Sequence, residues 1–452
     1  MNQPYLVEAA EQAVPVGYKQ TEVGVIPEGW SAYSLGQLSN FVTSGSRGWA
    51  KFYTNQGALF VRSQNVRNGK LDLKDSQFVT PKLGAEGDRT RLKLYDLLIT
   101  ITGNSVGNVA LVEQDLGDAY ISQHVGLVRL KNIEIANYIC MFLSPHSIGN
   151  FQILASQSGQ SKPGLTLKDL NEFLIVIPMS QEEQVAIVNA LSDVDALLSE
   201  LEKLIAKKQA IKTATMQQLL TGRTRLPQFS LREDGSSKGT KKSELGNIPE
   251  DWKIQGFGEL FESSITRKSV KQSELVSFVG MQDVSENAQL TNQSEIQYRQ
   301  VKSGFTYFEK GDVLVAKITP CFENGKGCHT EQLETDIGFG STEFHVLRAK
   351  DSFDSVFIYF WTTRASLRVA LEAEMVGSAG HRRVPFSALQ NYQIPCSSDK
   401  NEQIAIANVL SDMDKEVQAL EQRLNKTRQI KQGMMQELLT GKTRLVTPQV
   451  RG

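Results

Sequence analysis

The sequence has few of the residues that build disulfide frameworks, metal centres or membrane spans. Its 452 residues include only four cysteines and five histidines, and the irregular cysteine spacing is typical of free thiols in a reducing cytoplasm. The longest apolar runs, such as Leu97–Ile101 and Phe173–Pro178, are far too short to cross a bilayer. The first residues have neither a basic start nor an apolar stretch, so no signal peptide is indicated. We therefore expect a cytoplasmic protein that contacts no membrane.

Signatures of catalysis are also missing. The chain has no Asn-Pro-Pro-Tyr or Asp-Pro-Pro-Tyr tetrapeptide of amino-methyltransferases, and no glycine-rich cofactor loop follows a strand. Gly441–Thr443 ends a predicted helix instead of opening one, and Gln436 stands where a phosphate-binding loop needs glycine. Cys321, Cys328 and His329 lack the spacing of a zinc site. These absences favour a binding protein with no catalytic residues and no metal.

Charge of either sign is nearly balanced over the whole chain. The formal net charge of −1 does not decide for or against a nucleic-acid partner, because DNA binding needs a local basic surface and not a basic average. Between positions 45 and 95, ten Lys and Arg residues stand against four acids. This stretch predicts a basic surface, with an ordinary solvated surface as the alternative.

What the chain does contain is two copies of one unit of more than 200 residues. Residues 17–38 and 239–260 are identical at ten of 22 positions at an offset of 222. Residues 183–226 match 402–445 without a gap at an offset of 219, with 23 of 44 positions identical. The segments between these shared blocks differ much more. One economical explanation is that the shared blocks meet the same partner twice, whereas the variable blocks meet two different targets.

The second shared block predicts a long helix in each copy. About 40 residues without proline lie between a start signal and a glycine stop, which corresponds to about 60 Å of helix. Each start has a proline just before it and the residue pair of a capping box, in which the side chains at the two ends of the first turn hydrogen-bond back to the backbone. The signals are Pro178, Ser180 with Glu183, and Gly222 in the first copy, and Pro395, Asp399 with Glu402, and Gly441 in the second.

Apolar residues in both helices follow the alternating spacing of four and three that marks a coiled-coil seam. Because the two helices match in register within one chain, we expect each to pair with the other; the alternative is that each packs on its own domain. Farther on, apolar character moves to Ile211 and Ile430, which predicts a stutter in the seam. The predicted seam residues are Ile187, Leu191, Val194, Leu198, Leu201 and Ile205, and Ile406, Leu410, Met413, Val417, Leu420 and Leu424.

The variable blocks are predicted to be rich in β-strands. The strand-like runs Leu97–Thr102 and Val313–Ile318 each lead into a polar loop that contains glycine. Such loops suit a DNA duplex, because glycine lets the backbone approach phosphates while Arg, Lys, Asn, Gln and Glu contact phosphates or base edges. An ordinary turn or surface role is the alternative for each residue. The DNA-contact candidates are Arg47, Trp49, Lys51, Asn104, Gln123 and His124 in the first block, and Asn324, Lys326, Glu343, His345, Arg382 and Arg383 in the second.

With these features, the chain resembles the specificity subunit of type I restriction–modification enzymes over nearly its whole length. The resemblance is strongest at Ile26–Trp30, Ile177–Leu226, Ile248–Trp252 and Ile394–Leu445, and Gly311–Pro320 is similar to part of a target-recognition domain of that family. It implies an α+β fold in which two β-rich target-recognition domains are separated by two long conserved helices. These helices would form an antiparallel coiled coil, and the internal repeat would have pseudo-twofold symmetry.

The resemblance also implies the partners. Each target-recognition domain would read one half of a split, asymmetric site in double-stranded DNA, and the helices would dock two methyltransferase subunits. Restriction subunits, where present, would add ATP-driven translocation and cleavage. S-adenosylmethionine, ATP and Mg would belong to those partners, and this chain would hold no cofactor.

Two other functions stay open at this point. One is a coiled-coil assembly scaffold that joins protein ligands and reads no DNA, and the other is an unrecognised nuclease or methyltransferase. The expected domain boundaries are an amino-terminal arm with the start of the repeat at 1–27, a first target-recognition domain at 28–179, a first helix at 180–222, a linker at 223–247, a second target-recognition domain at 248–397, a second helix at 398–445 and a tail at 446–452.

Overall fold

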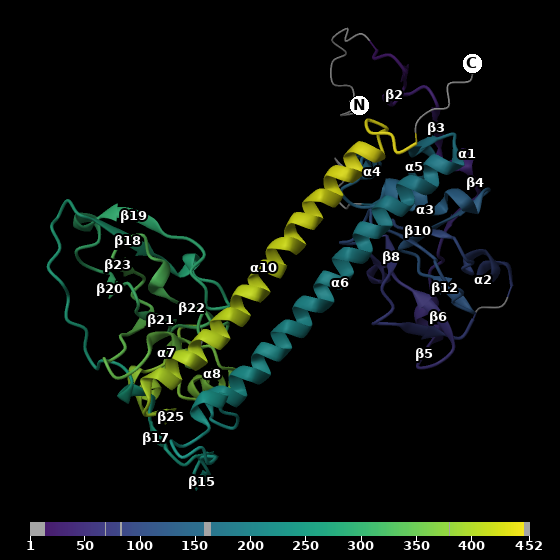
Figure 1. Ribbon diagram of the computed structural model, residues 1–452. Coiled ribbons are helices and arrows are strands. Elements are labelled where there is room, and N and C mark those ends of the chain that lie inside the picture. The colour runs from purple at the N-terminus through teal and green to yellow at the C-terminus, as the bar shows by residue number, and fades with distance from the viewer. Residues whose placement is uncertain (1–13, 68, 82–83, 158–163, 379, 447–452) are drawn as a thin grey trace. The chain divides into compact units, whose positions relative to one another are not determined.

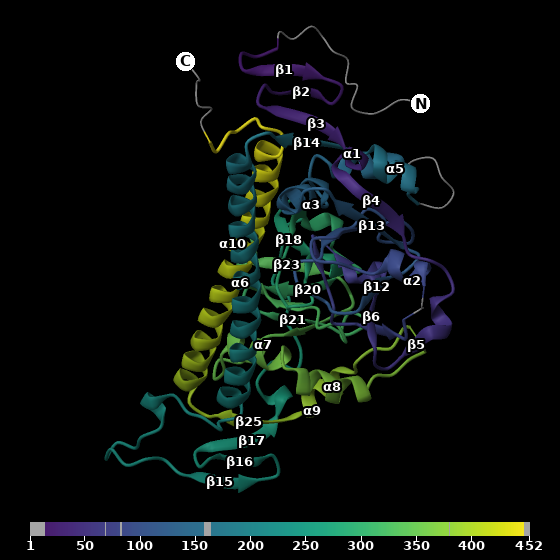
Figure 2. The ribbon, with the colours of Figure 1, turned by 90° about the vertical axis from the view of Figure 1, so that its right-hand side faces the viewer.

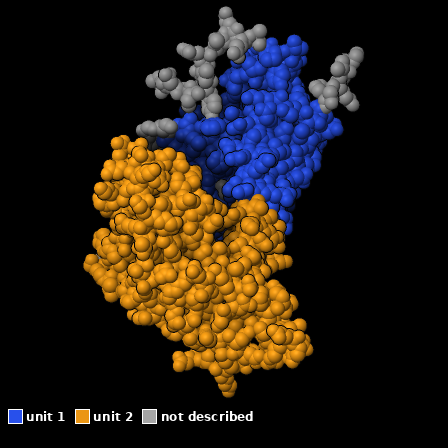
Figure 3. Space-filling model, turned by 60° about the vertical axis from the view of Figure 1, so that its left-hand side comes forward, with its two compact units in different colours: residues 1–202, 422–452 blue, residues 203–421 orange. Residues whose placement is uncertain are grey.

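The computed structural model describes residues 14–67, 69–81, 84–157, 164–378 and 380–446 (Figure 1). The chain divides into two compact units, coloured separately in Figure 3. Unit 1 comprises residues 1–202 and 422–452, and unit 2 comprises residues 203–421. Each unit holds one β-rich domain and about half of each of two long helices. The fold class is therefore α+β, with the repeat that the sequence predicts.

Each shared block forms one long helix, as predicted. Each helix stops shortly before a glycine, Gly222 or Gly441, and the φ angles of these glycines, 68° and 72°, lie in the left-handed region that glycine adopts without strain. None of the described helices carries an apolar stretch long enough to cross a membrane. The long helices are α6 (Gln181–Leu220) and α10 (Lys400–Leu438).

The two long helices lie side by side and antiparallel (Figures 1 and 2). In unit 1 the Nζ atom of Lys431 is 2.6 Å from Oδ1 of Asp195. In unit 2 Lys212 forms the equivalent ion pair with Asp414. Lys212 stands 219 positions before Lys431, and Asp414 stands 219 positions after Asp195. The same contact is therefore made twice, which is what a pseudo-twofold repeat of an antiparallel pair requires.

The heptad seam continues farther than the sequence indicated. Ile211 and Ile430, where we expected apolar character to move, are 41% and 50% exposed, so the predicted stutter is wrong. Lys212 and Lys431 instead keep the seam position, because each ammonium group reaches an aspartate on the opposite helix. None of the twelve predicted seam residues is classed as exposed.

The β-rich domain of unit 1 contains two four-stranded sheets with the strand orders β11-β10-β13-β4 and β12-β6-β9-β5, and three two-stranded pairs, β1-β2, β14-β3 and β7-β8. Five short helices pack around them. The strands are β1 (Tyr18–Thr21), β2 (Gly24–Pro27), β3 (Trp30–Ser34), β4 (Ser39–Ser44), β5 (Tyr53–Thr54), β6 (Ala58–Val61), β7 (Val66–Arg67), β8 (Lys70–Leu71), β9 (Gln77–Val79), β10 (Leu97–Thr100), β11 (Val109–Leu111), β12 (Ala119–Ile121), β13 (Val125–Leu130) and β14 (Leu174–Pro178). The helices are α1 (Leu35–Leu38), α2 (Ala85–Thr90), α3 (Ala136–Leu143), α4 (Asn150–Ser156) and α5 (Leu167–Glu172).

The β-rich domain of unit 2 has a similar plan with three strands fewer among the described residues: a counterpart of β4 and of the β7-β8 pair is absent. Its sheets have the orders β22-β21-β24 and β19-β18-β23-β20, and its two-stranded pairs are β15-β16 and β17-β25. The hairpin β15-β16 begins within the segment 223–247 that we expected to be a linker. The strands are β15 (Thr240–Ser243), β16 (Gly246–Pro249), β17 (Trp252–Gly256), β18 (Leu275–Val279), β19 (Ser294–Gln297), β20 (Thr306–Glu309), β21 (Val313–Ala316), β22 (Gly327–His329), β23 (Ile337–Gly340), β24 (Phe344–Leu347) and β25 (Gln393–Ser397). The helices are α7 (Ser355–Thr362), α8 (Ala365–Ala373) and α9 (Phe386–Asn391).

Among the described residues of unit 2, no counterpart of β4 pairs with β24, so one edge of β24 is open. In unit 1, β4 covers the equivalent edge of β13. In the described part of unit 2, a single bridge between Phe261 and Ala349, just after the end of β24, takes its place. A cavity of about 350 Å³ lies beside this edge, lined by residues 262–265 and 267 together with residues 344–346 of β24.

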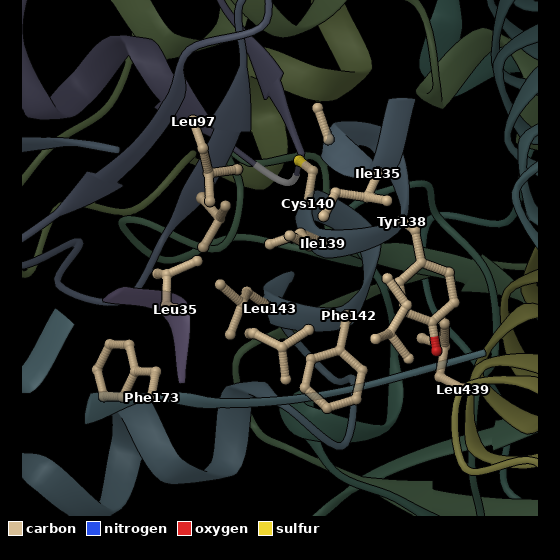
Figure 4. Close-up of a cluster of buried hydrophobic side chains, with 14 of the residues drawn as sticks. Leu35, Leu97, Ile135, Tyr138, Ile139, Cys140, Phe142, Leu143, Phe173 and Leu439 are labelled. Carbon is tan, nitrogen blue, oxygen red and sulfur yellow. The ribbon is translucent and has the colours of Figure 1, made fainter. Parts of the chain in front are cut away.

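Each main hydrophobic core joins a β-rich domain to the ends of both long helices. In unit 1 the start of α6 and the end of α10 pack against helix α3 and its sheet; Figure 4 shows part of this core, with Leu439 near Tyr138. In unit 2 the end of α6 and the start of α10 pack in the same way against helix α7 and its sheet. The residues of the long helices, and of the turn directly after α10, in the unit 1 core are Ile187, Leu191, Met435, Leu438 and Leu439, and their counterparts in unit 2 are Ile406, Leu410, Met216, Leu219 and Leu220.

A buried carboxylate at the start of each long helix explains why the shared motifs recur. The indole Nε1 of Trp252 donates to Glu402 at 2.9 Å, and Arg225 donates two hydrogen bonds of 2.8 Å to the same carboxylate. In unit 1, Trp30 and Arg444 hold Glu183 in the same way. The motifs that contain Trp, Glu and Arg therefore meet in space.

This cluster corrects the predicted capping boxes. Ser180 does accept a hydrogen bond from the Glu183 backbone at 3.4 Å, and Asp399 accepts one from Asn401. The carboxylates of Glu183 and Glu402, however, each bond to a buried Trp and a partly buried Arg. A buried carboxylate gains more from a charged partner than from closing the first turn of a helix.

Candidate nucleic-acid interface

Three loops meet at the end of strand β10 in unit 1. The Ile101 amide donates to the His124 carbonyl at 2.9 Å, and the Ile101 carbonyl accepts from the Leu165 amide at 2.8 Å. Residues 102–108, 122–124 and 164–165 therefore form one connected group, which we name the first loop cluster. Gly103 and Gly107 have φ angles of 101° and 88°, so this hairpin needs glycine to turn.

Unit 2 builds the same framework at the end of strand β21. The Lys317 amide donates to the Glu343 carbonyl at 2.9 Å, and the Lys317 carbonyl accepts from the Val384 amide at 2.8 Å. Residues 318–326, 341–345 and 381–384 form the second loop cluster. Its backbone contacts repeat those of the first cluster, although the loop sequences differ.

The side chains on this common framework differ in charge. In the first loop cluster they are mostly neutral and polar: His124 contacts Thr102, and its Nε2 is 3.1 Å from Nε2 of Gln123. In the second cluster Arg383 forms a bidentate ion pair with Glu343, with distances of 2.9 and 2.8 Å. These hydrogen bonds hold the pKa of the Glu343 carboxyl below its ordinary value, so the group is ionised at neutral pH.

The structure divides the predicted residues of the first block between two places. Asn104, Gln123 and His124 lie together in the first loop cluster, where Asn104 and His124 are exposed. Arg47 and Lys51 are also exposed but lie outside this cluster, before strand β5.

Trp49 is a correction to the predicted set. It is only 3% exposed and packs against Phe60, Tyr120 and Phe52 in a small aromatic core. A side chain buried in this way cannot reach a base or phosphate. Although a Trp in a glycine-rich loop could stack on a DNA base, Trp49 instead packs in the apolar core.

All six predicted residues of the second block lie in the second loop cluster. Apart from the Arg383–Glu343 pair, each contacts a neighbouring segment. Asn324 donates to the Glu286 carboxylate, and Lys326, His345 and Arg382 contact the carbonyl oxygens of Met281, Val384 and Glu372, respectively. Burial lowers the pKa of His345, so its ring is neutral and Nε2 donates to Val384. Contact with DNA stays a prediction for all of them.

Sequence reasoning missed Arg368 of helix α8. A Cβ atom placed on Gly325 would lie 2.4 Å from its Nη1 atom, so the arginine lies directly against the second loop cluster. Burial lowers the pKa of Arg368. No local pattern could reveal this contact, because helix and loop are distant in sequence.

The basic stretch between residues 45 and 95 is largely at the surface. Lys82 lies outside the described residues, and the other Lys and Arg residues are exposed except Arg62, which is partly buried. Arg62 and Arg91 pair with Asp75 and Asp118, so part of the positive charge is neutralised within the protein.

These features define a class: a duplicated α+β chain in which two units carry equivalent loop clusters and share an antiparallel helix pair. Two segments of the chain, residues 27–213 and 249–431, match the family model described as the type I restriction modification DNA specificity domain. The matches cover most of the chain, so it belongs to the family of type I restriction–modification specificity subunits.

Known relatives agree with this family. Over 437 residues the chain is 22% identical to the putative type I restriction enzyme MjaX specificity subunit of Methanocaldococcus jannaschii, which covers 95% of this chain and 97% of that protein. It is 34% identical over 150 residues to the type I restriction enzyme EcoEI specificity subunit of Escherichia coli, covering 33% of this chain. That match, and a similar one to the EcoAI subunit, span about a quarter of those relatives.

Solved structures show the same fold. The crystal structure of the type I restriction–modification S subunit from M. genitalium superposes with a TM-score of 0.53 at 14% sequence identity, covering 90% of this chain and 96% of that one. A second structure, from work on complex assembly and conformational transition of the type I R-M system, gives a TM-score of 0.52 at 17% identity.

Proposed function

We propose that this chain is the DNA sequence-specificity subunit of a type I restriction–modification complex and reads a bipartite, asymmetric target in double-stranded DNA. The observation that carries the proposal is the pair of loop clusters. Each of the two units holds three loops. The backbone hydrogen bonds between these loops are the same in both units, but the side chains that the loops carry differ. A repeated framework with unlike side chains is suited to reading two unlike half-sites, because base-edge contacts and not backbone geometry specify sequence.

The long helices support a split target. Helix α6 has 40 residues, which corresponds to about 60 Å. This length lies between one and two turns of B-DNA at roughly 34–36 Å per turn. We infer that base pairs between the two half-sites are not read.

The partners follow from the repeat of the helix surfaces. Val185 and Ile404 are counterparts and both are exposed, as are Ile211 and Ile430. An apolar surface that is presented twice suits two copies of one partner, and we assign this role to two methyltransferase subunits. Restriction subunits, where present, would join the same complex.

We assign no chemistry to this chain. The reaction on adenine, with S-adenosylmethionine, belongs in this proposal to the methyltransferase subunits, and ATP and Mg belong to the partner subunits. The complex would act in the cytoplasm, where its DNA lies.

Mapping methylated adenines by single-molecule sequencing tests the proposal. A host that expresses the chain with its methyltransferase is expected to show methylation at one two-part motif, and deletion of this gene alone should abolish it. Methylation that is indifferent to the gene, or that follows no motif, would contradict the proposal. The purified chain alone should methylate nothing.

A scaffold that only joins proteins is the alternative, because the exposed apolar helix residues would also suit it. Duplex binding by the assembled complex that depends on base order and persists against competitor DNA separates the two functions. Binding that is equal for all sequences would favour the scaffold.

A further inference from the structure

One ion pair in the second loop cluster, between Arg383 and Glu343, holds an arginine in place and leaves part of it exposed. Nε and Nη2 of Arg383 donate to the two carboxylate oxygens of Glu343 at 2.9 and 2.8 Å. The Arg383 side chain nevertheless remains 43% exposed, and that of Glu343 remains 25% exposed. The guanidinium is therefore held on one edge and accessible elsewhere.

The hydrogen-bond inventory of Arg383 leaves donors for a ligand. A guanidinium has five N–H groups in a plane, and Glu343 accepts two of them. Nη1 donates a third to the His381 carbonyl at 3.2 Å. One N–H group therefore remains on each terminal nitrogen, and both carry the charge that strengthens a hydrogen bond.

Both partners are fixed by backbone contacts. The Arg383 amide donates to the Val376 carbonyl at 2.8 Å, and the Val376 amide donates back at 3.0 Å. The Glu343 amide donates to Ser341 Oγ at 3.1 Å, while its carbonyl accepts from Lys317. The guanidinium is therefore oriented before any ligand arrives, which reduces the entropy lost on binding.

The pair belongs to unit 2 alone. The equivalent backbone positions in the first loop cluster, identified by the same hydrogen bonds and bridges, are His124 and Gly164. A glycine offers no side chain there. The framework is common to both units, and this pair is one of the features that distinguish them.

We propose that Glu343 is a positioning residue that presents Arg383 to a guanine in the half-site read by unit 2. This inference rests on the proposed function and names one base of its target. Guanine presents two adjacent acceptors, N7 and O6, in the major groove, and arginine is their commonest partner. Glu343 was itself a predicted base contact, but Arg383 occupies both its carboxylate oxygens, so it acts through the arginine.

The test is to map the methylated motif for the full chain assembled with its methyltransferase, as wild type and as variants. Arg383→Ala is expected to reduce the preference for guanine at one position of one half-site about ten-fold or more. Arg383→Lys keeps the charge but loses the planar fork, so it should relax the same position. Glu343→Gln should relax that position to a smaller extent and leave the other positions unchanged.

Arg232→Ala provides a matched control. It removes an exposed Arg–Glu pair, in which Arg232 is 45% exposed, from outside the loop clusters, and it should leave the motif unaltered. Thermal melting of each complex checks folding, and the lysine and glutamine variants keep the test available if the alanine variant is unstable.

Three results would overturn the inference while leaving the proposed function intact: an unchanged motif in Arg383→Ala, methylation lowered equally for all sequences, or relaxation at a position that is not guanine. A wild-type complex that methylates no defined motif would instead overturn the proposed function itself.

Discussion

At the scale of single residues, Glu183 and Glu402 show how the shared motifs are used. Each carboxylate is 1% exposed and would be costly to bury without a partner. Trp30 with Arg444, and Trp252 with Arg225, supply the hydrogen bonds and the opposite charge. The residues come from motifs that are far apart in the chain but meet in each unit.

We expect Arg225→Met to destabilise unit 2 by about 3–5 kcal/mol, because it leaves Glu402 buried without its charged partner. Arg232→Met, which breaks the exposed pair with Glu250, should cost about 0–1 kcal/mol. Urea unfolding measures both free energies. The double variant Arg225→Met with Glu402→Leu should recover much of the loss, and equal effects of the two single variants would show that the buried cluster contributes little.

At the scale of elements, the two β-rich domains differ in whether one edge of a sheet is covered. In unit 1, Leu127 of β13 pairs with Thr43 of β4 on one side and with Leu98 of β10 on the other. Val346 of β24, the counterpart of Leu127, pairs only with Leu314 among the described strands. The cavity of about 350 Å³ lies on its other side.

The amide of Val346 is therefore expected to exchange with solvent faster than that of Leu127, by roughly ten-fold if one ladder hydrogen bond is worth about 1.4 kcal/mol. Hydrogen exchange followed by mass spectrometry, on peptides that cover β13 and β24, measures this difference. Equal protection of the two strands would mean that the edge of β24 is covered in solution.

At the scale of the whole molecule, the long helices serve both units, and two of their surfaces have separate roles. The seam residues Leu201 and Leu420 are counterparts that are buried or partly buried, whereas Ile211 and Ile430 face solvent. Pairing depends on the first surface, and in the proposed function docking depends on the second.

Leu201→Asp with Leu420→Asp is expected to disrupt the helix pair, because it places two carboxylates in an apolar seam. Truncating a buried leucine alone costs about 2–5 kcal/mol. Melting temperature and co-purification with the methyltransferase should both fall. Ile211→Asp with Ile430→Asp should leave melting unchanged and reduce co-purification only. A seam variant that still assembles at normal stoichiometry would contradict this assignment.

Much of the architecture could be predicted because it depends on local pattern. The repeat, the long helices, their pairing and their glycine stops follow from identity at a fixed offset, from heptad spacing and from the backbone freedom of Gly222 and Gly441. The stutter at Ile211 and Ile430 was wrong because a lysine in the seam was read as a break. Only the partner helix, which supplies an aspartate, makes that lysine compatible with the seam.

By itself, then, the sequence determined that this protein has two copies of one unit, with long helices that share a common seam. Only the tertiary structure decided that Trp49 is core, that Arg368 lies against Gly325, that Arg383 is held by Glu343 and that β24 has an open edge. The physical reason is the separation along the chain between the residues that interact. Periodicity and turn chemistry act between neighbours in the chain, whereas burial, ion pairing and strand coverage depend on which distant segments come to lie together.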